Sequence, residues 1–170
     1  MKVILFDLGN TLEDTKHEVL LPGASKTLKA VREMRDAQGA APALALVSDF
    51  GETGATPAQL PAARAEYYAI LDRHGIRGFF EPVARRVILS AEVGAEKPSE
   101  KIFRAVIDRI DPSLGFKDIF FVTELKPHVT AARALGMRAA HFRGPGQTAG
   151  EVKRLPDLVP LFKTFLQAAS

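Results

Sequence analysis

Polar residues follow four apolar runs of the sequence, and their chemical types suit a single reaction. They are Asp7 after residues 2–6, Ser48 after 43–47, Lys97 in the loop beyond 87–89, and Glu124 after 119–122. A carboxylate can attack phosphorus, and a hydroxyl and an ammonium can hold phosphoryl oxygens while their charge develops. A second carboxylate beside the first can complete a Mg²⁺ site. Together these groups predict phosphoryl transfer through an aspartyl-phosphate at Asp7.

These residues can act together only if the fold brings them to one place. A short apolar run bounded by turn residues is typical of a strand buried on both faces. In a parallel sheet the carboxyl ends of the strands lie along one edge, where open α/β sheets bind ligands. Asp7 could instead cap a turn or a helix, since Asp commonly caps. We favour the functional interpretation because Ser48, Lys97 and Glu124 fit the same edge.

Helical patterns separate the strands along most of the chain. Helices are predicted over residues 24–38, 56–74, 99–110, 127–135 and 157–168, and a further strand over 138–142. Thr56-Pro57 is predicted to start the second helix, with Thr as its cap. Residues 13–22 are predicted to form a loop or a short hairpin. The alternation predicts an α/β fold, a Rossmann-like three-layer α/β/α sandwich with a mainly parallel central sheet, as one domain over residues 1–170.

Composition argues against several classes of partner. The 170 residues carry a net charge of +3 with no dense Lys/Arg run, no Trp and 2 Tyr, which argues against nucleic acid. No stretch approaches the length of a membrane span and the N-terminus lacks a signal-peptide pattern, so we expect no membrane partner and a cytoplasmic location. The sequence has no cysteine, which excludes disulfides and thiolate zinc sites.

Four motifs, in order, resemble those of the haloacid dehalogenase superfamily of hydrolases, most of which are phosphatases. They are Phe6-Asp7-Leu8-Gly9-Asn10-Thr11-Leu12, then Ala45-Leu46-Val47-Ser48, then Gly94-Ala95-Glu96-Lys97-Pro98 before Ile102-Phe103, then Phe121-Val122-Thr123-Glu124 before His128 and residues 131–137. The resemblance covers roughly residues 1–143. One motif alone is weak, but the ordered set strongly favours the fold.

The resemblance implies a Mg²⁺-dependent phosphatase that acts on a phosphorylated substrate of unknown size. It implies catalytic roles for Asp7, Ser48 and Lys97. It also implies substrate contacts from Asn10, Thr11, Ser48, Asp49 and Lys97, and metal contacts from Asp7, the Gly9 carbonyl and Glu124.

The first motif departs from the family pattern. Family phosphatases carry a second Asp, the general acid/base, where this chain has Gly9. Losing a positioned acid/base costs roughly 10²- to 10⁴-fold in rate. Glu13, Asp14 or His17, just downstream, are candidate replacements on the basis of proximity in sequence.

The fourth motif departs as well. Glu124 replaces the family's Asp, and its longer side chain would loosen a Mg²⁺ site that demands near-ideal octahedral distances. His128 stands where the family has an Asp that positions the metal or the lysine, and a neutral histidine would weaken both effects. An exposed residue in the first turn of a helix is an equally good interpretation of His128. His74 and His141 are interpreted as structural.

The region available for a cap is small. Residues 12–47, 36 positions, separate Thr11 from Ser48, and one helix with its approach uses most of them. The helix that carries Tyr67 and Tyr68 is interpreted as core, so we expect little or no cap domain. By analogy with the family, such an open site accepts large or macromolecular substrates.

Several functions remain open from the sequence. The leading hypothesis is a Mg²⁺-dependent phosphatase, slow because of Gly9, and the runner-up is a degenerate member that binds a ligand or partner without useful turnover. In an intermediate case Asp7 takes up phosphate and releases it slowly. A metal-independent dehalogenase is disfavoured because no helical cap is evident.

The last predicted helix bears on oligomeric state. It has a broad apolar face made of Leu158, Leu161, Phe162, Phe165 and Leu166. Packing of this face on the sheet is the expected explanation, and a dimer contact is the alternative. We therefore expect a monomer or a weak homodimer.

Overall fold

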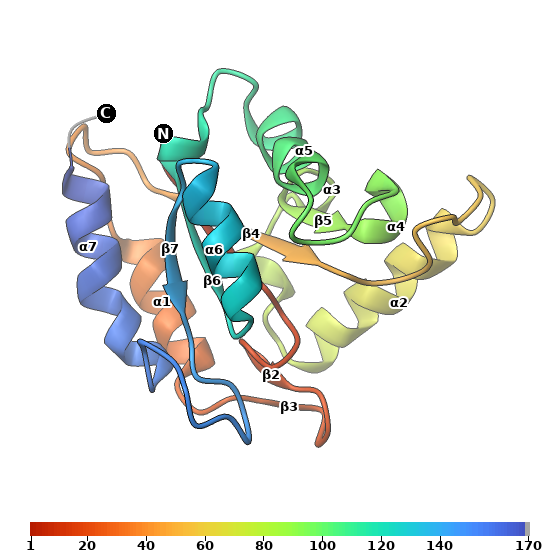
Figure 1. The fold of residues 1–170 in the computed structure, drawn as a ribbon, viewed down its shortest axis with the longest axis horizontal. Coiled ribbons are helices and arrows are strands. Elements are labelled where there is room, and N and C mark those ends of the chain that lie inside the picture. The colour runs from red at the N-terminus through yellow and green to blue at the C-terminus, as the bar shows by residue number, and fades with distance from the viewer. Residues whose placement is uncertain (169–170) are drawn as a thin grey trace.

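Five parallel strands form the central sheet of this computed structural model, which describes residues 1–168 (Figure 1). The strands lie in the order β5-β4-β1-β6-β7. Their bounds are β1 Val3–Phe6, β4 Ala43–Ser48, β5 Val87–Leu89, β6 Ile119–Thr123 and β7 Arg138–His141. β1 lies in the middle, paired with β4 on one side and β6 on the other. The carboxyl ends of all five strands therefore point to one edge, with the end of β1 at its centre.

Alternating side chains of the strands feed two separate cores. On β1, Ile4 and Phe6 contribute to one core, and Val3 and Leu5 to the other. All four are fully buried, as expected of a strand that is covered on both faces. The sheet is thus the middle layer of three.

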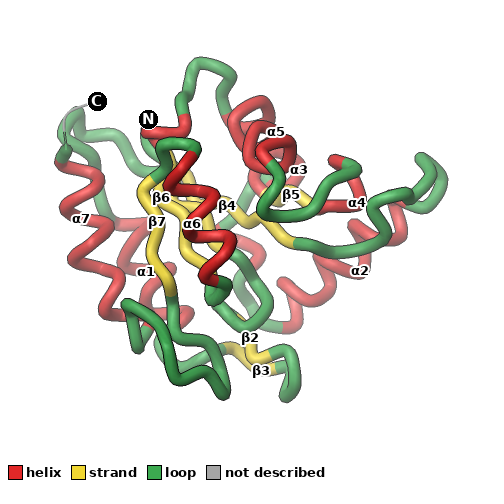
Figure 2. The backbone as a smooth tube through the Cα atoms, viewed as in Figure 1, coloured by secondary structure: helices red, strands yellow, loops and turns green. Residues whose placement is uncertain are grey.

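Helices cover both faces of the sheet (Figures 1 and 2). The face with Val3 and Leu5 is covered by α5 Glu100–Ile110 and α6 Lys126–Ala134. The face with Ile4 and Phe6 is covered by α1 Ala24–Glu33, α2 Leu60–Arg73 and α7 Val159–Gln167. The predicted Rossmann-like three-layer α/β/α sandwich is confirmed, with a central sheet that is parallel throughout.

The remaining elements are short. They are the antiparallel hairpin β2 Glu13–Asp14 and β3 Val19–Leu20, the helices α3 Val83–Arg86 and α4 Ser90–Val93, and the 3₁₀ helices Arg77–Phe79, Phe116–Asp118 and Leu155–Leu158. The hairpin follows the carboxyl end of β1, and in the figures it lies beyond that end of the sheet. It is the short hairpin that the sequence allowed for residues 13–22. α3 and α4 were not predicted.

The first helix is shorter than the predicted range of residues 24–38. It ends at Glu33, because Met34 is extended and the Asp36 carboxylate accepts hydrogen bonds from the amides of Gln38 (3.0 Å) and Ala40 (2.9 Å). This side chain offers the backbone an alternative to helical hydrogen bonds, so the helix does not continue.

Two predicted helix starts also move. The second helix begins at Leu60, because the amide and the hydroxyl of Thr56 both donate to Gln59 Oε1 (2.8 and 2.9 Å) and close a separate turn. Pro61 then takes the first-turn position that was assigned to Pro57. The last helix begins at Val159, after a 3₁₀ turn over Leu155–Leu158.

The apolar face of α7 packs on the sheet. Phe162 is fully buried, with its ring edge-to-face against Phe6 (centroids 5.8 Å apart) and Phe120 (5.1 Å). Leu161 is 41% exposed, whereas the other members of the predicted face are buried. Packing on the sheet thus accounts for nearly all of this face.

We expect Phe162→Ala to lower the free energy of unfolding by about 3 kcal/mol, since it removes an aromatic side chain behind β1 and leaves a cavity. Leu161→Ala, on the exposed side of the same helix, should change it by no more than about 0.5 kcal/mol. Urea unfolding of the two variants checks this. Equal effects of the two substitutions would show that α7 does not pack through Phe162.

The structure contains little that could act as a cap. The segment between β1 and β4 consists of the β2–β3 hairpin and α1, and α1 belongs to the core. α2 contributes Tyr67 and Leu71 to the same core. Across residues 1–168, no helix has both the length and the apolar character that crossing a membrane requires.

Candidate active site

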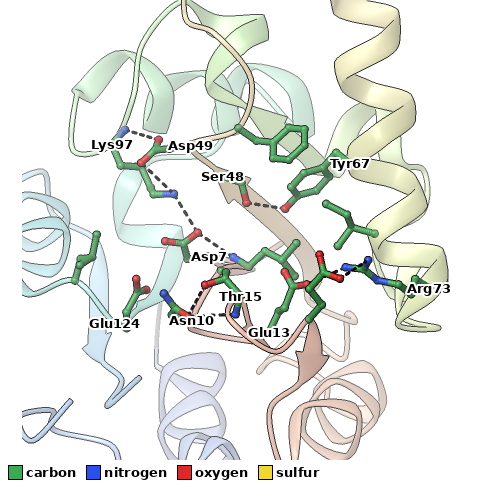
Figure 3. A pocket seen from close by; sticks show the side chains of 16 residues that line it. Asp7, Asn10, Glu13, Thr15, Ser48, Asp49, Tyr67, Arg73, Lys97 and Glu124 are labelled. Carbon is green, nitrogen blue, oxygen red and sulfur yellow. Dashed lines mark hydrogen bonds and ion pairs between the residues drawn. The ribbon is translucent and has the colours of Figure 1, made fainter. Parts of the chain in front are cut away.

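A cavity of about 400 Å³ opens at the carboxyl edge of the sheet, directly above β1. Asp7, Ser48, Lys97 and Glu124 all line it, although they are far apart in sequence (Figure 3). The hairpin and α2 form a further wall, through Glu13, Thr15, Glu18, Tyr67, Ile70 and Arg73. The topology of the parallel sheet thus brings the predicted strand-end residues to one place.

Asp7 and Lys97 form a buried ion pair at the centre of the site. Lys97 Nζ lies 3.1 Å from Asp7 Oδ1 and also donates to the Val47 carbonyl (3.0 Å). The Lys97 side chain is 1% exposed and that of Asp7 10%. The amide of Leu8 donates to the same Asp7 oxygen (2.9 Å). A buried ion pair is weak evidence for stability, because desolvation offsets the attraction, so its position at the cavity favours a functional explanation.

Asp49 holds the lysine loop in place. Its Oδ1 accepts a hydrogen bond from the Lys97 amide (2.9 Å), and its Oδ2 lies 3.6 Å from Lys97 Nζ. Asp49 lines the cavity, so the residue predicted to contact substrate also positions the ammonium group.

Glu124 is oriented by two threonines. The hydroxyls of Thr11 and Thr123 donate to Glu124 Oε2, at 2.8 and 3.3 Å, and the Glu124 amide donates to the Thr11 hydroxyl (3.2 Å). Thr11 is fully buried, and it is not among the residues that line the cavity. Its hydroxyl therefore orients Glu124 rather than facing the cavity, where it was predicted to contact substrate.

Both carboxylates of the site, Asp7 and Glu124, have a raised pKa. Burial raises the pKa of Asp7 against the opposing effect of Lys97, and burial together with the Asp7 charge raises the pKa of Glu124. Asp7 and Glu124 therefore bind protons more tightly in the folded protein than in the unfolded chain. For Glu124, the corresponding stability is fully present below the ordinary glutamate pKa of 4.5 and is lost as the pH rises through the pKa of Glu124 in the folded protein.

We expect Glu124→Gln to stabilise the metal-free protein at neutral pH by about 1 kcal/mol, because the amide keeps the acceptor oxygen and removes the repulsion with Asp7. The gain should shrink as the pH falls toward 4.5, where wild-type Glu124 is itself protonated. Urea unfolding at several pH values measures it. Glu151→Gln is the opposite control, since Arg133 holds the pKa of Glu151 below its usual range. A gain that did not depend on pH would contradict the electrostatic explanation.

The donor set suits a hard divalent cation. Asp7, Glu124 and Gly9 all line the cavity, where the two side chains would supply carboxylates to a cation and Gly9 its backbone carbonyl. Within residues 1–168, no three His, Cys, Asp or Glu side chains gather into a metal-binding cluster. Mg²⁺ is commonly held by one or two carboxylates and several waters, so the all-oxygen set fits it. The mutual repulsion of the carboxylates is what a bound cation would relieve.

Ser48 has a partner that the sequence did not reveal. Its hydroxyl lies 2.6 Å from the hydroxyl of Tyr67, which is buried on α2. Burial raises the pKa of Tyr67, so the phenol stays neutral. Tyr67 fixes the direction of the Ser48 hydroxyl at the cavity. The helical pattern predicted only that Tyr67 belongs to the core.

The segment after Gly9 is closely packed. A Cβ at Gly9 would meet the Thr15 methyl carbon at 3.1 Å, so Thr15 borders the place of the missing side chain. Asn10 has a left-handed backbone (φ 52°), and its Oδ1 accepts from the amide (3.3 Å) and the hydroxyl (2.9 Å) of Thr15. The predicted substrate contact Asn10 thus lines the cavity with its carbonyl oxygen bound to Thr15.

The interpretation of His128 as an exposed residue is wrong. It is 7% exposed, in the first turn of α6, and its Nδ1 has no hydrogen-bond partner within residues 1–168. Burial and the charge of Lys97 lower its pKa, so the ring is neutral where the family pattern has a carboxylate. The start of α6 faces the carboxyl edge of the sheet, and this packing buries His128.

The two histidines that were interpreted as structural, His74 and His141, have defined partners. His141 Nε2 lies 3.1 Å from the Glu124 carbonyl oxygen, which agrees with a structural role. His74 Nε2 lies 2.8 Å from Glu13 Oε1, at the cavity wall. The contact between His74 and Glu13 joins residues 61 positions apart, and no local pattern predicted it.

No family model matches the sequence, and no curated protein is significantly similar to it. Solved structures do match the fold. A haloacid dehalogenase-like family protein from Streptococcus pneumoniae matches with a TM-score of 0.67 at 11% identity, over 95% of this chain and 98% of that one. A HAD-superfamily hydrolase from Ehrlichia chaffeensis matches with 0.63 at 15% identity, over 98% and 100%. YfnB from Bacillus subtilis, assigned to the HAD hydrolases and solved with bound magnesium, matches with 0.61 at 16% identity, over 85% and 56%.

Proposed function

We propose, on the premise that the chain has the haloacid dehalogenase-like fold that its four motifs predict, that it is a Mg²⁺-dependent phosphatase. The reaction would transfer a phosphoryl group from a phosphate monoester to Asp7 and then to water. The observation that carries the proposal is the buried Asp7–Lys97 pair, 3.1 Å apart, at the base of a cavity that Ser48 and Glu124 also line.

The first step follows from the contacts of Asp7. One carboxylate oxygen of Asp7 attacks phosphorus, and the bond from phosphorus to the leaving-group oxygen breaks. Lys97 Nζ, which lies against Asp7, and the Ser48 hydroxyl, fixed by Tyr67, would bind the phosphoryl oxygens as charge develops on them. Mg²⁺ held by Asp7, the Gly9 carbonyl and Glu124 would supply further positive charge to these oxygens.

In the second step water attacks phosphorus, the bond between phosphorus and Asp7 breaks, and phosphate leaves. The site is open to this water, because the hairpin and α2 form a wall beside Asp7 and no element within residues 1–168 closes over it. The same openness supports a broad range of substrate sizes by analogy with weakly capped members of the fold.

The test is phosphate release from a generic aryl phosphate with and without Mg²⁺, combined with trapping of the phosphorylated protein. Intact mass would detect the added phosphoryl group, and borohydride reduction followed by peptide mapping would place it on Asp7. We expect metal-dependent release that Asp7→Asn abolishes. Release that does not need Mg²⁺, or no release above the variant, would overturn the proposal.

A second candidate, a protein that binds a phosphorylated ligand without turnover, is favoured by one feature. Gly9 carries no acid/base, and the neighbouring Thr15 leaves little room for one. This candidate predicts saturable binding of inorganic phosphate that depends on Lys97, with no phosphate release from the aryl ester. Isothermal titration calorimetry with inorganic phosphate measures this binding, which an unfolded protein or a blocked site would not show.

A further inference from the structure

The turn after Asp7 brings Glu13 next to Gly9. The amides of Thr11, Leu12 and Glu13 all donate to the carbonyl of Leu8, at 3.2, 2.8 and 3.0 Å. Gly9 and Glu13 also form an isolated β-bridge. Because the chain wraps around a single carbonyl, position 13 lies beside position 9, where the side chain of the family's acid/base is missing.

Glu13 is the one of the three candidate replacements that lines the cavity with Asp7. Asp14 follows it on the short strand β2, so its side chain points to the opposite face. It lines a separate cavity and pairs with His17 Nδ1 at 2.7 Å. The His17 side chain is 62% exposed. Of the three candidates that the sequence could not rank, the tertiary structure thus places Glu13 at the cavity of Asp7 and the other two away from it.

The Glu13 carboxylate is buried and held from one side. Its residue is 6% exposed, and its Oε1 lies 2.8 Å from His74 Nε2 and 3.4 Å from Arg73 Nη2. Arg73 is the last residue of α2, which forms a wall of the cavity (Figure 3), and His74 is the C-cap residue that follows it. A carboxylate that lines the same cavity as a nucleophile, and is itself oriented by a hydrogen bond, has the arrangement of a general acid/base.

Thr15, which borders the place of the missing side chain at Gly9, cannot supply this chemistry. Its hydroxyl donates to Asn10 Oδ1 (2.9 Å), and an aliphatic hydroxyl is too weak an acid and too weak a base to act as a general acid/base near neutral pH. Among the residues that line the cavity on the hairpin side, the other carboxylate is Glu18, whose side chain is 67% exposed and pairs with Arg73. Glu13 is therefore the better placed group.

We propose that Glu13 is the proton carrier of the reaction, in place of the side chain that Gly9 lacks. This inference rests on the proposed function. Protonated Glu13 gives its proton to the leaving-group oxygen as the bond from that oxygen to phosphorus breaks and Asp7 is phosphorylated. The resulting carboxylate then takes a proton from the water whose oxygen attacks phosphorus. Asp7 is released as a carboxylate, phosphate leaves, and Glu13 regains its proton for the next turnover.

The experiment compares Glu13→Gln with Asp14→Asn, the neighbouring acid on the same hairpin that lies outside the cavity. Two substrates separate the half-reactions: an aryl phosphate, whose leaving group needs no proton, and an alkyl phosphate, whose leaving group does. Glu13→Gln should turn over the alkyl phosphate about 10²- to 10⁴-fold more slowly than wild type. With the aryl phosphate it should accumulate phosphorylated Asp7, detected by intact mass. Asp14→Asn should match wild type on both substrates.

Chemical rescue distinguishes proton transfer from a structural role. Added formate should restore part of the turnover of Glu13→Ala, because a small acid can enter the space of the missing side chain. If Glu13→Gln does not fold, Glu13→Asp keeps the charge and withdraws the carboxylate by one methylene, and it should show the same accumulation.

The outcomes separate this inference from the proposed function. Wild-type turnover that is unchanged in Glu13→Gln would overturn the inference alone. Lost turnover with neither phosphorylated Asp7 nor rescue by formate would assign Glu13 a structural role and overturn it as well. A wild-type protein without turnover would overturn the proposed function first, and this inference with it.

Discussion

Asp7→Asn is expected to abolish phosphate release, with a fall in rate of about 10⁴-fold or more, because an amide cannot form the bond to phosphorus. The substitution should leave the fold intact. The amide side chain of the variant keeps an oxygen that can accept from the Leu8 amide and from Lys97, the two donors to Asp7 Oδ1. Steady-state kinetics with an aryl phosphate, together with intact mass after mixing, measure both the turnover and the phosphorylated protein.

The control for Asp7→Asn is Asp108→Asn, which makes the same chemical change on the exposed side of α5. It should retain wild-type activity when purified in parallel. Equal activity of wild type and Asp7→Asn would mean that the turnover comes from another group or from a contaminating phosphatase. Under either explanation, Asp7 would have no part in the observed turnover.

Lys97→Met should have the next largest effect, on activity and on stability together. Removing the ammonium takes away a charge that would stabilise the phosphoryl oxygens, which we expect to lower the rate about 10²- to 10³-fold. The same change leaves Asp7 buried without its cation, with Asp49 and Glu124 nearby. Breaking a buried ion pair from one side typically costs about 3–5 kcal/mol. Kinetics and urea unfolding of the variant measure the two effects.

A double variant tests the electrostatic cause of this loss of stability. In Lys97→Met with Asp7→Asn, neither buried charge remains, so the free energy of unfolding should recover a large part of what Lys97→Met loses. Lys101→Met, which removes an exposed lysine from α5, is the control for loss of a lysine as such. Additive effects of Lys97→Met and Asp7→Asn would show that the two side chains do not stabilise each other.

The balance of charge in the cavity predicts how the protein responds to Mg²⁺. Asp7 and Lys97 neutralise each other, and Arg73 pairs with Glu18 on the cavity wall, but Asp49 and Glu124 add negative charge around the same space. A cation at the Asp7–Glu124 position would offset part of this excess, so activity and stability should respond to Mg²⁺ in the same direction. The proposed phosphatase and the proposed role of Glu13 thus share one site but depend on different side chains.

The sequence by itself determined the fold and the residues at the strand ends. Short apolar runs that alternate with helical patterns have few solutions other than a parallel sheet covered on both faces. The parallel arrangement then places Asp7, Ser48 and Glu124 at one edge, whatever the details of the helices. These features depend on local pattern and on a general rule of topology, so they could be predicted without knowing any contact.

Tertiary structure alone decided which side chains support the strand-end residues. The contacts between Ser48 and Tyr67 and between Glu13 and His74 join segments 19 and 61 positions apart, and no periodicity specifies them. The burial of His128 depends on how the start of α6 meets the sheet edge. The place of Glu13 beside Gly9 depends on a turn in which three amides share one carbonyl. Each of these results from packing between elements, and packing depends on the whole chain, whereas hydrophobic periodicity depends only on neighbours in sequence.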